Sequence, residues 1–158
     1  MKASVSANYE ALPQELRDSK IWLLWRYEFV EQRLTKVPYR ADEPSRRAQS
    51  NNPQTWSSFA CAVSSVTPNF DGIGLCMHGE LAGVDLDSCR NAETGEIADW
   101  ARHILARFNS YAEVSPSGKG VHILMRLAAP LPKGKRKLGD KEKGWEIGLF
   151  DRTSPAAA

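Results

Sequence analysis

The stretch Gly83-Val84-Asp85-Leu86-Asp87 closes an apolar run that begins at residue 81, and the organisation of the chain is best worked out from it. The run is typical of a β-strand. Side chains two apart on a strand share a face, so Asp85 and Asp87 point the same way, with Cα atoms ~6.5–7 Å apart, while Val84 and Leu86 face the core. Two carboxylates on one face repel each other, and a divalent cation such as Mg²⁺ or Mn²⁺ relieves that repulsion. The same pattern also fits two solvent-facing acids on an edge strand.

The segments around this strand alternate between helical and extended patterns. The clearest helix is predicted over 95–108, where an apolar stripe recurs at helical spacing. The segments 71–77 and 81–89 are predicted to form a hairpin through His78-Gly79-Glu80. Further helices are expected over 11–18 and from Asn52-Pro53 onward, and further strands over 20–30, 111–115, 121–127 and 145–150. These elements predict a single α+β domain.

A third acid follows in the last predicted strand. Glu146, in Trp145-Glu146-Ile147, opens a short apolar strand of the same presumptive sheet. Together with Asp85 and Asp87 it makes a three-carboxylate cluster of the kind that supports two-metal chemistry. Asp151, five residues further on, is the competing candidate.

The segment Ser115-Pro116-Ser117-Gly118-Lys119-Gly120-Val121-His122 is a candidate anion-binding loop. Two glycines let backbone amides approach an anion closely, and a lysine and two hydroxyls add further donors. His122 begins an apolar strand, from which it can donate to a phosphate oxygen. The segment is not a Walker A loop, because position 113 is Glu and position 120 is Gly. A plain hairpin turn remains the alternative.

Composition excludes several classes of protein. The chain has 158 residues, 42% of them hydrophobic, and a formal net charge of +2, which argues against disorder, and its apolar runs are too short to span a membrane. Three cysteines without paired spacing favour a reducing cytoplasm over a disulfide scaffold, and a zinc site on Cys76, His78 and Cys89 lacks the usual ligand spacing. Charge is unevenly spread: residues 133–143 hold six basic and two acidic residues, a charge of +4, which leaves about −2 for the remainder. We expect this basic stretch to be a loop, serving either solubility or contact with phosphates.

In their order and spacing, the three motifs resemble those of the archaeo-eukaryotic primase superfamily, and most closely the primase–polymerase (prim-pol) domains of phage and plasmid replication proteins. Those domains carry an Asp-x-Asp strand, a Ser/Gly loop ending in His, and a later acid on a strand. Flanking segments are similar as well: Trp22-Leu23-Leu24-Trp25-Arg26-Tyr27, Lys36-Val37-Pro38-Tyr39, Asn52-Pro53-Gln54-Thr55-Trp56 and Gly72-Ile73-Gly74.

The resemblance implies an RRM-like catalytic core with an N-terminal αβ unit, and template-directed nucleotidyl transfer in the replication of a mobile element. Asp85, Asp87 and Glu146 would be catalytic and would hold two Mg²⁺ or Mn²⁺ ions. The dNTP or NTP would be bound by Ser115, Ser117, Gly118, Lys119, His122 and Lys36. A single-stranded DNA template would be contacted by Lys133, Lys135, Arg136 and Lys137. A helicase module, in trans or on a longer chain, is the implied partner.

The resemblance predicts a prim-pol-like domain over residues 1–154 that lacks the usual final strand, followed by a short tail at 155–158 that reads as a truncation or cloning scar. This departure keeps two alternatives open. One is a catalytically degenerate module that binds nucleotide or nucleic acid, and the other, weaker one is a two-metal nuclease.

Overall fold

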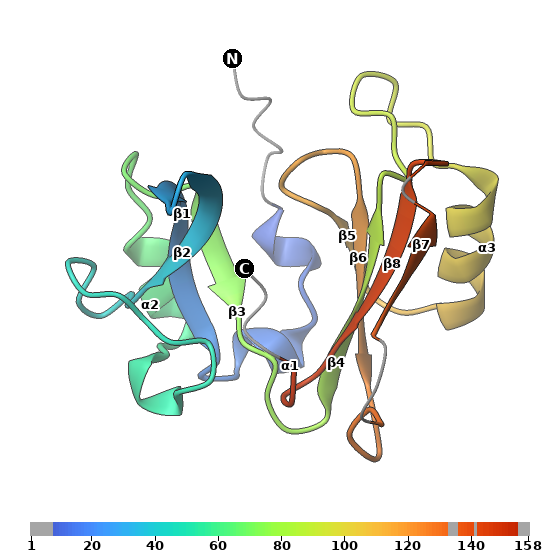
Figure 1. Cartoon of the computed structure of the whole chain (residues 1–158). Coiled ribbons are helices and arrows are strands. Elements are labelled where there is room, and N and C mark those ends of the chain that lie inside the picture. The colour runs from blue at the N-terminus through green and yellow to red at the C-terminus, as the bar shows by residue number, and fades with distance from the viewer. Residues whose placement is uncertain (1–7, 133–135, 141, 155–158) are drawn as a thin grey trace. The chain divides into compact units, whose positions relative to one another are not determined.

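The computed structural model describes residues 8–132, 136–140 and 142–154. These residues form two compact units (Figure 1). The first comprises Gly79–Thr153 together with the residues up to Ala11, and the second comprises Leu12–His78 together with Ser154. The expected single domain over 1–154 stays a prediction. Residues 1–7 of that domain and the expected tail at 155–158 lie outside the described residues.

The first unit is built on an antiparallel five-stranded sheet in the order β5-β6-β4-β8-β7. Its central strand β4 (Leu81–Asp87) is the Asp-x-Asp strand, and it is hydrogen-bonded on both sides. The other strands are β5 (Ala112–Val114), β6 (Val121–Arg126), β7 (Lys137–Asp140) and β8 (Trp145–Phe150). The two motifs that follow Asp-x-Asp in the chain thus lie on the strands that flank it.

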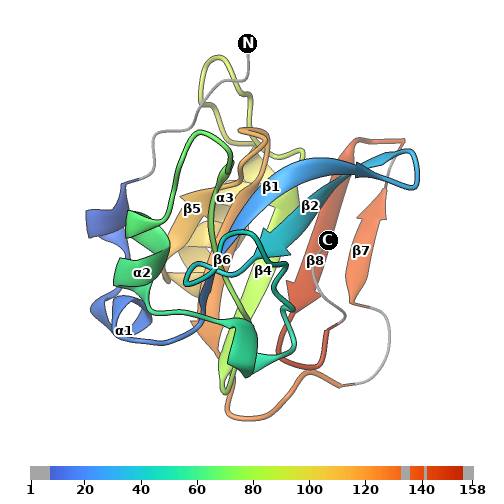
Figure 2. The same ribbon diagram turned by 90° about the vertical axis from the view of Figure 1, so that its left-hand side faces the viewer.

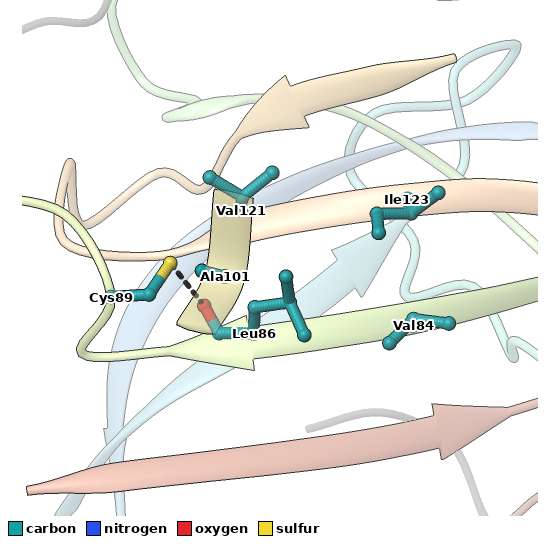
Figure 3. Close-up of a cluster of buried hydrophobic side chains, with 6 residues drawn as sticks. All are labelled: Val84, Leu86, Cys89, Ala101, Val121 and Ile123. Carbon is teal, nitrogen blue, oxygen red and sulfur yellow. Dashed lines mark hydrogen bonds between the residues drawn. The ribbon is translucent and has the colours of Figure 1, made fainter. Parts of the chain in front are cut away.

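One face of this sheet is covered by helix α3 (Asp99–Phe108), which begins four residues later than the predicted 95–108 but carries its apolar stripe at the predicted spacing. Val84 and Leu86 are buried on this face, as the alternation along β4 predicted. They pack with Val121 and Ile123 of β6 and with Ala101 of α3 (Figure 3). Each large side chain buried here contributes roughly 1.5–3 kcal/mol. Because this face holds the core, the acids of β4 must lie on the other one.

The second unit contains a three-stranded antiparallel sheet in the order β2-β1-β3. Strand β1 (Trp22–Val30) pairs with β2 (Arg33–Tyr39) as a long hairpin (Figure 2), and with β3 (Gly72–Leu75) on its other side. Strand β2 had no counterpart among the predicted elements. Its turn, Glu31-Gln32, has φ of 48° and 64°, a conformation for which Asn-Gly is the usual sequence signal.

The helices of the second unit are shorter than predicted. Helix α1 covers Gln14–Arg17, and the helix expected from Asn52 onward is divided into a 3₁₀ turn at Pro53–Thr55 and helix α2 at Phe59–Ser64. The division arises because the Ser58 hydroxyl accepts from the N–H of Cys61 and starts a new helix. A further 3₁₀ turn, Tyr9–Ala11, belongs to the first unit.

Two predicted connections are wrong. Strands β3 and β4 do not form a hairpin through His78-Gly79-Glu80; they belong to different sheets, because both edges of β4 are taken by β6 and β8. The basic stretch 133–143 is not a loop throughout, since Lys137–Asp140 forms edge strand β7. A charged edge strand lacks the apolar alternation by which strands are recognised.

The mixed α+β class is confirmed, with mostly antiparallel strands and few helices. All three cysteines are free thiols, as expected. Within the described ranges, no helix is both long and apolar enough to cross a membrane.

Candidate active site

The exposed face of the five-stranded sheet carries a row of polar residues that are direct cross-strand neighbours. From β5 to β7 the row reads Glu113, His122, Asp85, Gly148 and Lys137. Residues directly opposite one another in an antiparallel sheet place their side chains on the same face. The fold therefore brings an acid and the histidine of two separate predicted motifs into contact distance.

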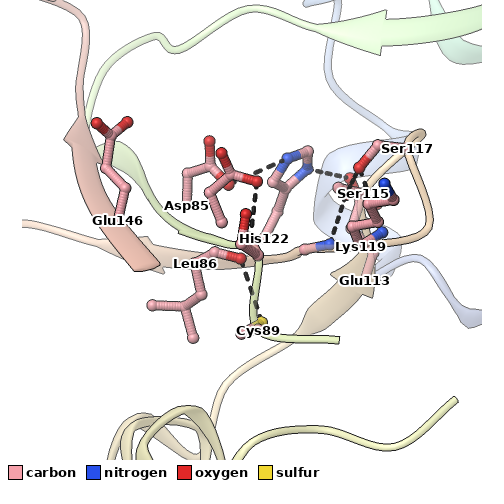
Figure 4. A network of polar contacts seen from close by, with 12 residues as sticks. Asp85, Leu86, Cys89, Glu113, Ser115, Ser117, Lys119, His122 and Glu146 are labelled. Carbon is pink, nitrogen blue, oxygen red and sulfur yellow. Dashed lines mark hydrogen bonds and ion pairs between the residues drawn. The ribbon is translucent and has the colours of Figure 1, made fainter. Parts of the chain in front are cut away.

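A second row, one step further along β4, joins Asp87 to Glu146 of β8 and Gly139 of β7. The three predicted carboxylates thus occupy two adjacent rows of the same face. In Figure 4 the side chains of Asp85 and Glu146 extend to the same side of the ribbon. The backbone N–H of Ser88 donates to Asp87 Oδ1 at 2.8 Å, which orients this carboxylate at the end of β4.

His122 lies between two carboxylates. Its Nε2 is 3.7 Å from Asp85 Oδ1, and its Nδ1 is 3.3 Å from Glu113 Oε1 (Figure 4). With a carboxylate at each ring nitrogen, the imidazole is held in a fixed orientation. Glu113 was not among the predicted site residues, although the β5–β6 register puts it directly opposite His122.

Glu146 is engaged with a cation from the neighbouring strand. Lys137 Nζ donates to Glu146 Oε1 at 2.8 Å. This hydrogen bond raises the pKa of Lys137, and although partial desolvation works against the rise, the charges of Asp85 and Asp87 add to it. The ammonium of Lys137 is thus the internal counter-cation of the acidic face.

The donor set suits a hard divalent cation, because it offers three carboxylates on adjacent strands. Among the described residues, however, no group of three or more His, Cys, Asp or Glu side chains is arranged to hold a metal ion. For Glu146, the reason is its ion pair with Lys137, because the Lys137 ammonium lies against Glu146 Oε1.

The predicted anion loop is a tight turn held by its own serines. The Ser115 hydroxyl is buried, accepts from the N–H of Gly120 at 3.0 Å and lies 2.9 Å from the Ser117 hydroxyl. The amide of Gly118 donates to the Ser115 carbonyl, and that of Lys119 to Ser117 Oγ. The backbone amides expected to meet an anion are therefore engaged within the loop, and the exposed side chains of Ser117 and Lys119 are what it presents outward.

The loop is held close against β4. A Cβ on Gly120 would lie 2.8 Å from the carbonyl oxygen of Leu86, so this position requires glycine. Arg90, another residue missed from the sequence, donates through Nη1 to the Gly118 carbonyl at 2.8 Å, and its backbone N–H bonds to the Lys119 carbonyl. The Asp-x-Asp strand and the loop are consequently one rigid assembly.

Asp151, the competing third acid, has a structural role. It is 4% exposed and forms an ion pair with Arg136 at 2.6 Å, and it also accepts from Thr153 and from the backbone of Leu131. Burial alone would raise the pKa of Asp151, but these hydrogen bonds outweigh burial and hold the pKa below its ordinary value. The cation beside Asp151 is thus a resident arginine.

The predicted basic contacts fall in different places. Lys133 and Lys135 lie outside the described residues. Arg136 is paired with Asp151, and Lys137 with Glu146. Lys36 belongs to the second unit, on β2, where its Nζ lies 5.2 Å from the ring centroid of Trp25.

The chain belongs to the prim-pol family, as its motifs predicted. The relative that shows this is the DNA primase-polymerase of Nitratiruptor phage NrS-1, to which the chain is 31% identical over 125 residues. The match covers 75% of the chain and 16% of the phage protein, so the chain corresponds to a small part of that relative's length. No protein-family model matches the chain.

Proposed function

We propose that the chain is a metal-dependent nucleotidyltransferase domain that extends a DNA strand on a single-stranded template, as a primase–polymerase. The observation that carries the proposal is the shared sheet face on which Asp85, Asp87, Glu146 and His122 lie as cross-strand neighbours. Kinship with a phage primase–polymerase supports this reading over other uses of such a face.

Asp85, Asp87 and Glu146 are the residues that would hold Mg²⁺ or Mn²⁺. Bound there, the ions would lower the pKa of an attacking 3′-hydroxyl and stabilise charge on the leaving phosphate. The three carboxylates would hold the ions at the sheet, and Asp87 is itself oriented by the Ser88 amide. The hydrogen bond between Lys137 and Glu146 must break before the Glu146 carboxylate can bind a metal ion.

His122, Lys119 and Ser117 are proposed to bind the triphosphate of a dNTP or NTP, and Ser115 and Gly118 to hold the loop that presents them. With its Nδ1 directed at Glu113, His122 presents Nε2 toward the acidic face. Glu113 is therefore a positioning residue. A helicase module, in trans or on a longer chain, remains the proposed partner in replication.

The experiment is extension of a labelled primer on a single-stranded template with Mn²⁺ or Mg²⁺, comparing the wild-type chain with Asp85→Asn and Asp87→Asn. Incorporation by the wild type that both substitutions abolish is the expected result. Equal incorporation by wild type and variants would overturn the proposal. Shortening of the labelled strand in place of its extension would identify a nuclease.

A second candidate is a module that binds nucleotide or nucleic acid without turnover. The Lys137–Glu146 ion pair favours it, because a resident ammonium neutralises part of the acidic face without any metal. Salt-sensitive DNA binding without incorporation, even at millimolar Mn²⁺, would establish this alternative.

A further inference from the structure

The three-stranded sheet of the second unit carries a row of aromatic side chains on one face. Trp25, Tyr27 and Phe29 alternate along β1, and their partners on β2 are Pro38, Lys36 and Leu34. On the other side of β1, Gly72 and Gly74 of β3 stand opposite Trp25 and Leu23. Alternate positions of a strand share a face, so these residues form one surface, which we call the aromatic face.

The opposite face of the same sheet is packed. Leu24, Val37 and Tyr39 are buried there, and Tyr39 stacks edge-on against Phe70. On the aromatic face, by contrast, Phe29 is 79% exposed and its cross-strand neighbour Leu34 is 56% exposed. The exposed apolar pair adds little to the core and is accessible to a ligand.

The ring nearest β3 is held in a fixed position. Trp25 Nε1 donates to the Ile73 carbonyl at 3.1 Å, and a Cβ on Gly72 would lie 3.3 Å from the same nitrogen. The two glycines thus let the indole lie across β3. Trp25 and Tyr27 meet edge-to-face with centroids 5.2 Å apart. The rings of Trp25 and Tyr27 are therefore preorganised.

The charge of the aromatic face is positive. Lys36 lies over the Trp25 ring, and none of the positions that form the face is an acid. Asp71 lies beside it, and its carboxylate accepts a hydrogen bond from the backbone N–H of Tyr27 at 2.7 Å. Aromatic residues whose Cα atoms lie about 6.5–7 Å apart along a strand, with a cation beside them, suit a single-stranded nucleic acid, because its bases stack on aromatic rings and its phosphates are attracted to positive charge.

We propose that the aromatic face is a binding platform for single-stranded nucleic acid, on which bases stack against Phe29 and its neighbours while Lys36 meets the backbone. The choice of a nucleic acid rather than a protein as occupant rests on the proposed function. The platform itself consists only of residues of the second unit and needs no metal.

The test is binding of a labelled oligothymidylate by fluorescence anisotropy at low salt in the presence of EDTA. Phe29→Ala is expected to weaken binding roughly 5- to 150-fold, the range for losing one base–aromatic stack. Phe29→Trp should bind at least as tightly as the wild type. The matched control is Phe108→Ala, which removes a phenylalanine that is 40% exposed at the end of α3 and should change binding less than twofold.

A strand of equal length with abasic sites separates stacking from charge. It should bind the wild type more weakly, and Phe29→Ala should make no further difference to it. Equal affinity of wild type and Phe29→Ala for oligothymidylate, or no binding by the wild type, would overturn the inference and leave the face to a protein partner. The binding assay contains EDTA and no metal, so loss of incorporation in Asp85→Asn and loss of oligothymidylate binding in Phe29→Ala report separately on the two proposals.

Discussion

The two sheets of this protein use the same construction for different purposes. Each packs one face against its own core and leaves the other half-exposed, but the five-stranded sheet places carboxylates and a histidine there, whereas the three-stranded sheet places aromatic rings and a lysine. Like charges on one face destabilise it until a cation arrives, while stacked rings are stable without a ligand. The activity of the acidic face is therefore expected to require a metal ion, and ligand binding by the aromatic face is expected not to.

The largest expected effect comes from removing a carboxylate from the acidic face of the five-stranded sheet. Asp85→Asn is expected to lower primer extension on the order of 10³-fold or more, because the loss of several kcal/mol of charge stabilisation costs a factor of ten per ~1.4 kcal/mol. Without divalent ions, the midpoint of thermal unfolding of Asp85→Asn should equal or exceed that of the wild type, because the substitution relieves repulsion between the carboxylates. A variant with lowered midpoint and unchanged extension would mean that Asp85 is structural.

Asp151 sharpens the comparison, because it is an acid of the same unit that already has a resident cation. Asp151→Ala removes the ion pair with Arg136, whose side chain is mostly buried, and should cost about 3–5 kcal/mol in the free energy of unfolding. The pKa of Asp151 is lowered in the folded state, so its contribution is fully present above the unfolded pKa of about 4 and is lost as pH falls below that value.

Urea unfolding of wild type and Asp151→Ala at pH 7 and at pH 3 measures both effects. The difference between the two proteins should shrink at the lower pH. A constant difference across this range would show that the ionised carboxylate contributes no stability.

Glu113 tests whether the histidine of the acidic face needs a fixed orientation. Glu113→Ala should weaken triphosphate binding about fivefold, the equivalent of one hydrogen bond of ~1 kcal/mol, and Glu113→Gln should retain most of the affinity through its amide oxygen. Nitrogen chemical shifts of His122 should change in the alanine variant, because Nδ1 loses its contact with Glu113. An unchanged His122 spectrum would contradict the positioning role.

Lys137 offers the smallest and most specific change. Lys137→Met removes the ion pair with Glu146 and a positive charge that repels a metal ion. Mn²⁺ should therefore bind two- to fivefold more tightly by calorimetry, in keeping with the modest energy of an exposed ion pair. Lys143→Met is the matched control, since Lys143 is 77% exposed and pairs with Asp140 in the turn before β8. If both variants bind Mn²⁺ equally more tightly, the effect is due to the change in net charge and not to the Lys137–Glu146 ion pair.

The sequence by itself determined the α+β class, the main helix α3, the strand alternation at Val84-Asp85-Leu86-Asp87 and the relationship to prim-pol domains. These depend on local periodicity and on motif order, which the chain carries directly. The pairing of Glu113 with His122 was within reach as well, because two predicted strands joined by a short loop imply a register.

Only the tertiary structure decided which strand lies beside which. The run at 71–77 has the same local pattern as a hairpin arm, yet β3 pairs with β1 because β4 has no edge left. Likewise, Glu146 and Asp151 are both acids in one short segment, and their surroundings alone separate a half-exposed carboxylate on the acidic face from a buried one bound to Arg136. Long-range pairing and burial are properties of the assembled chain, so no local pattern contains them.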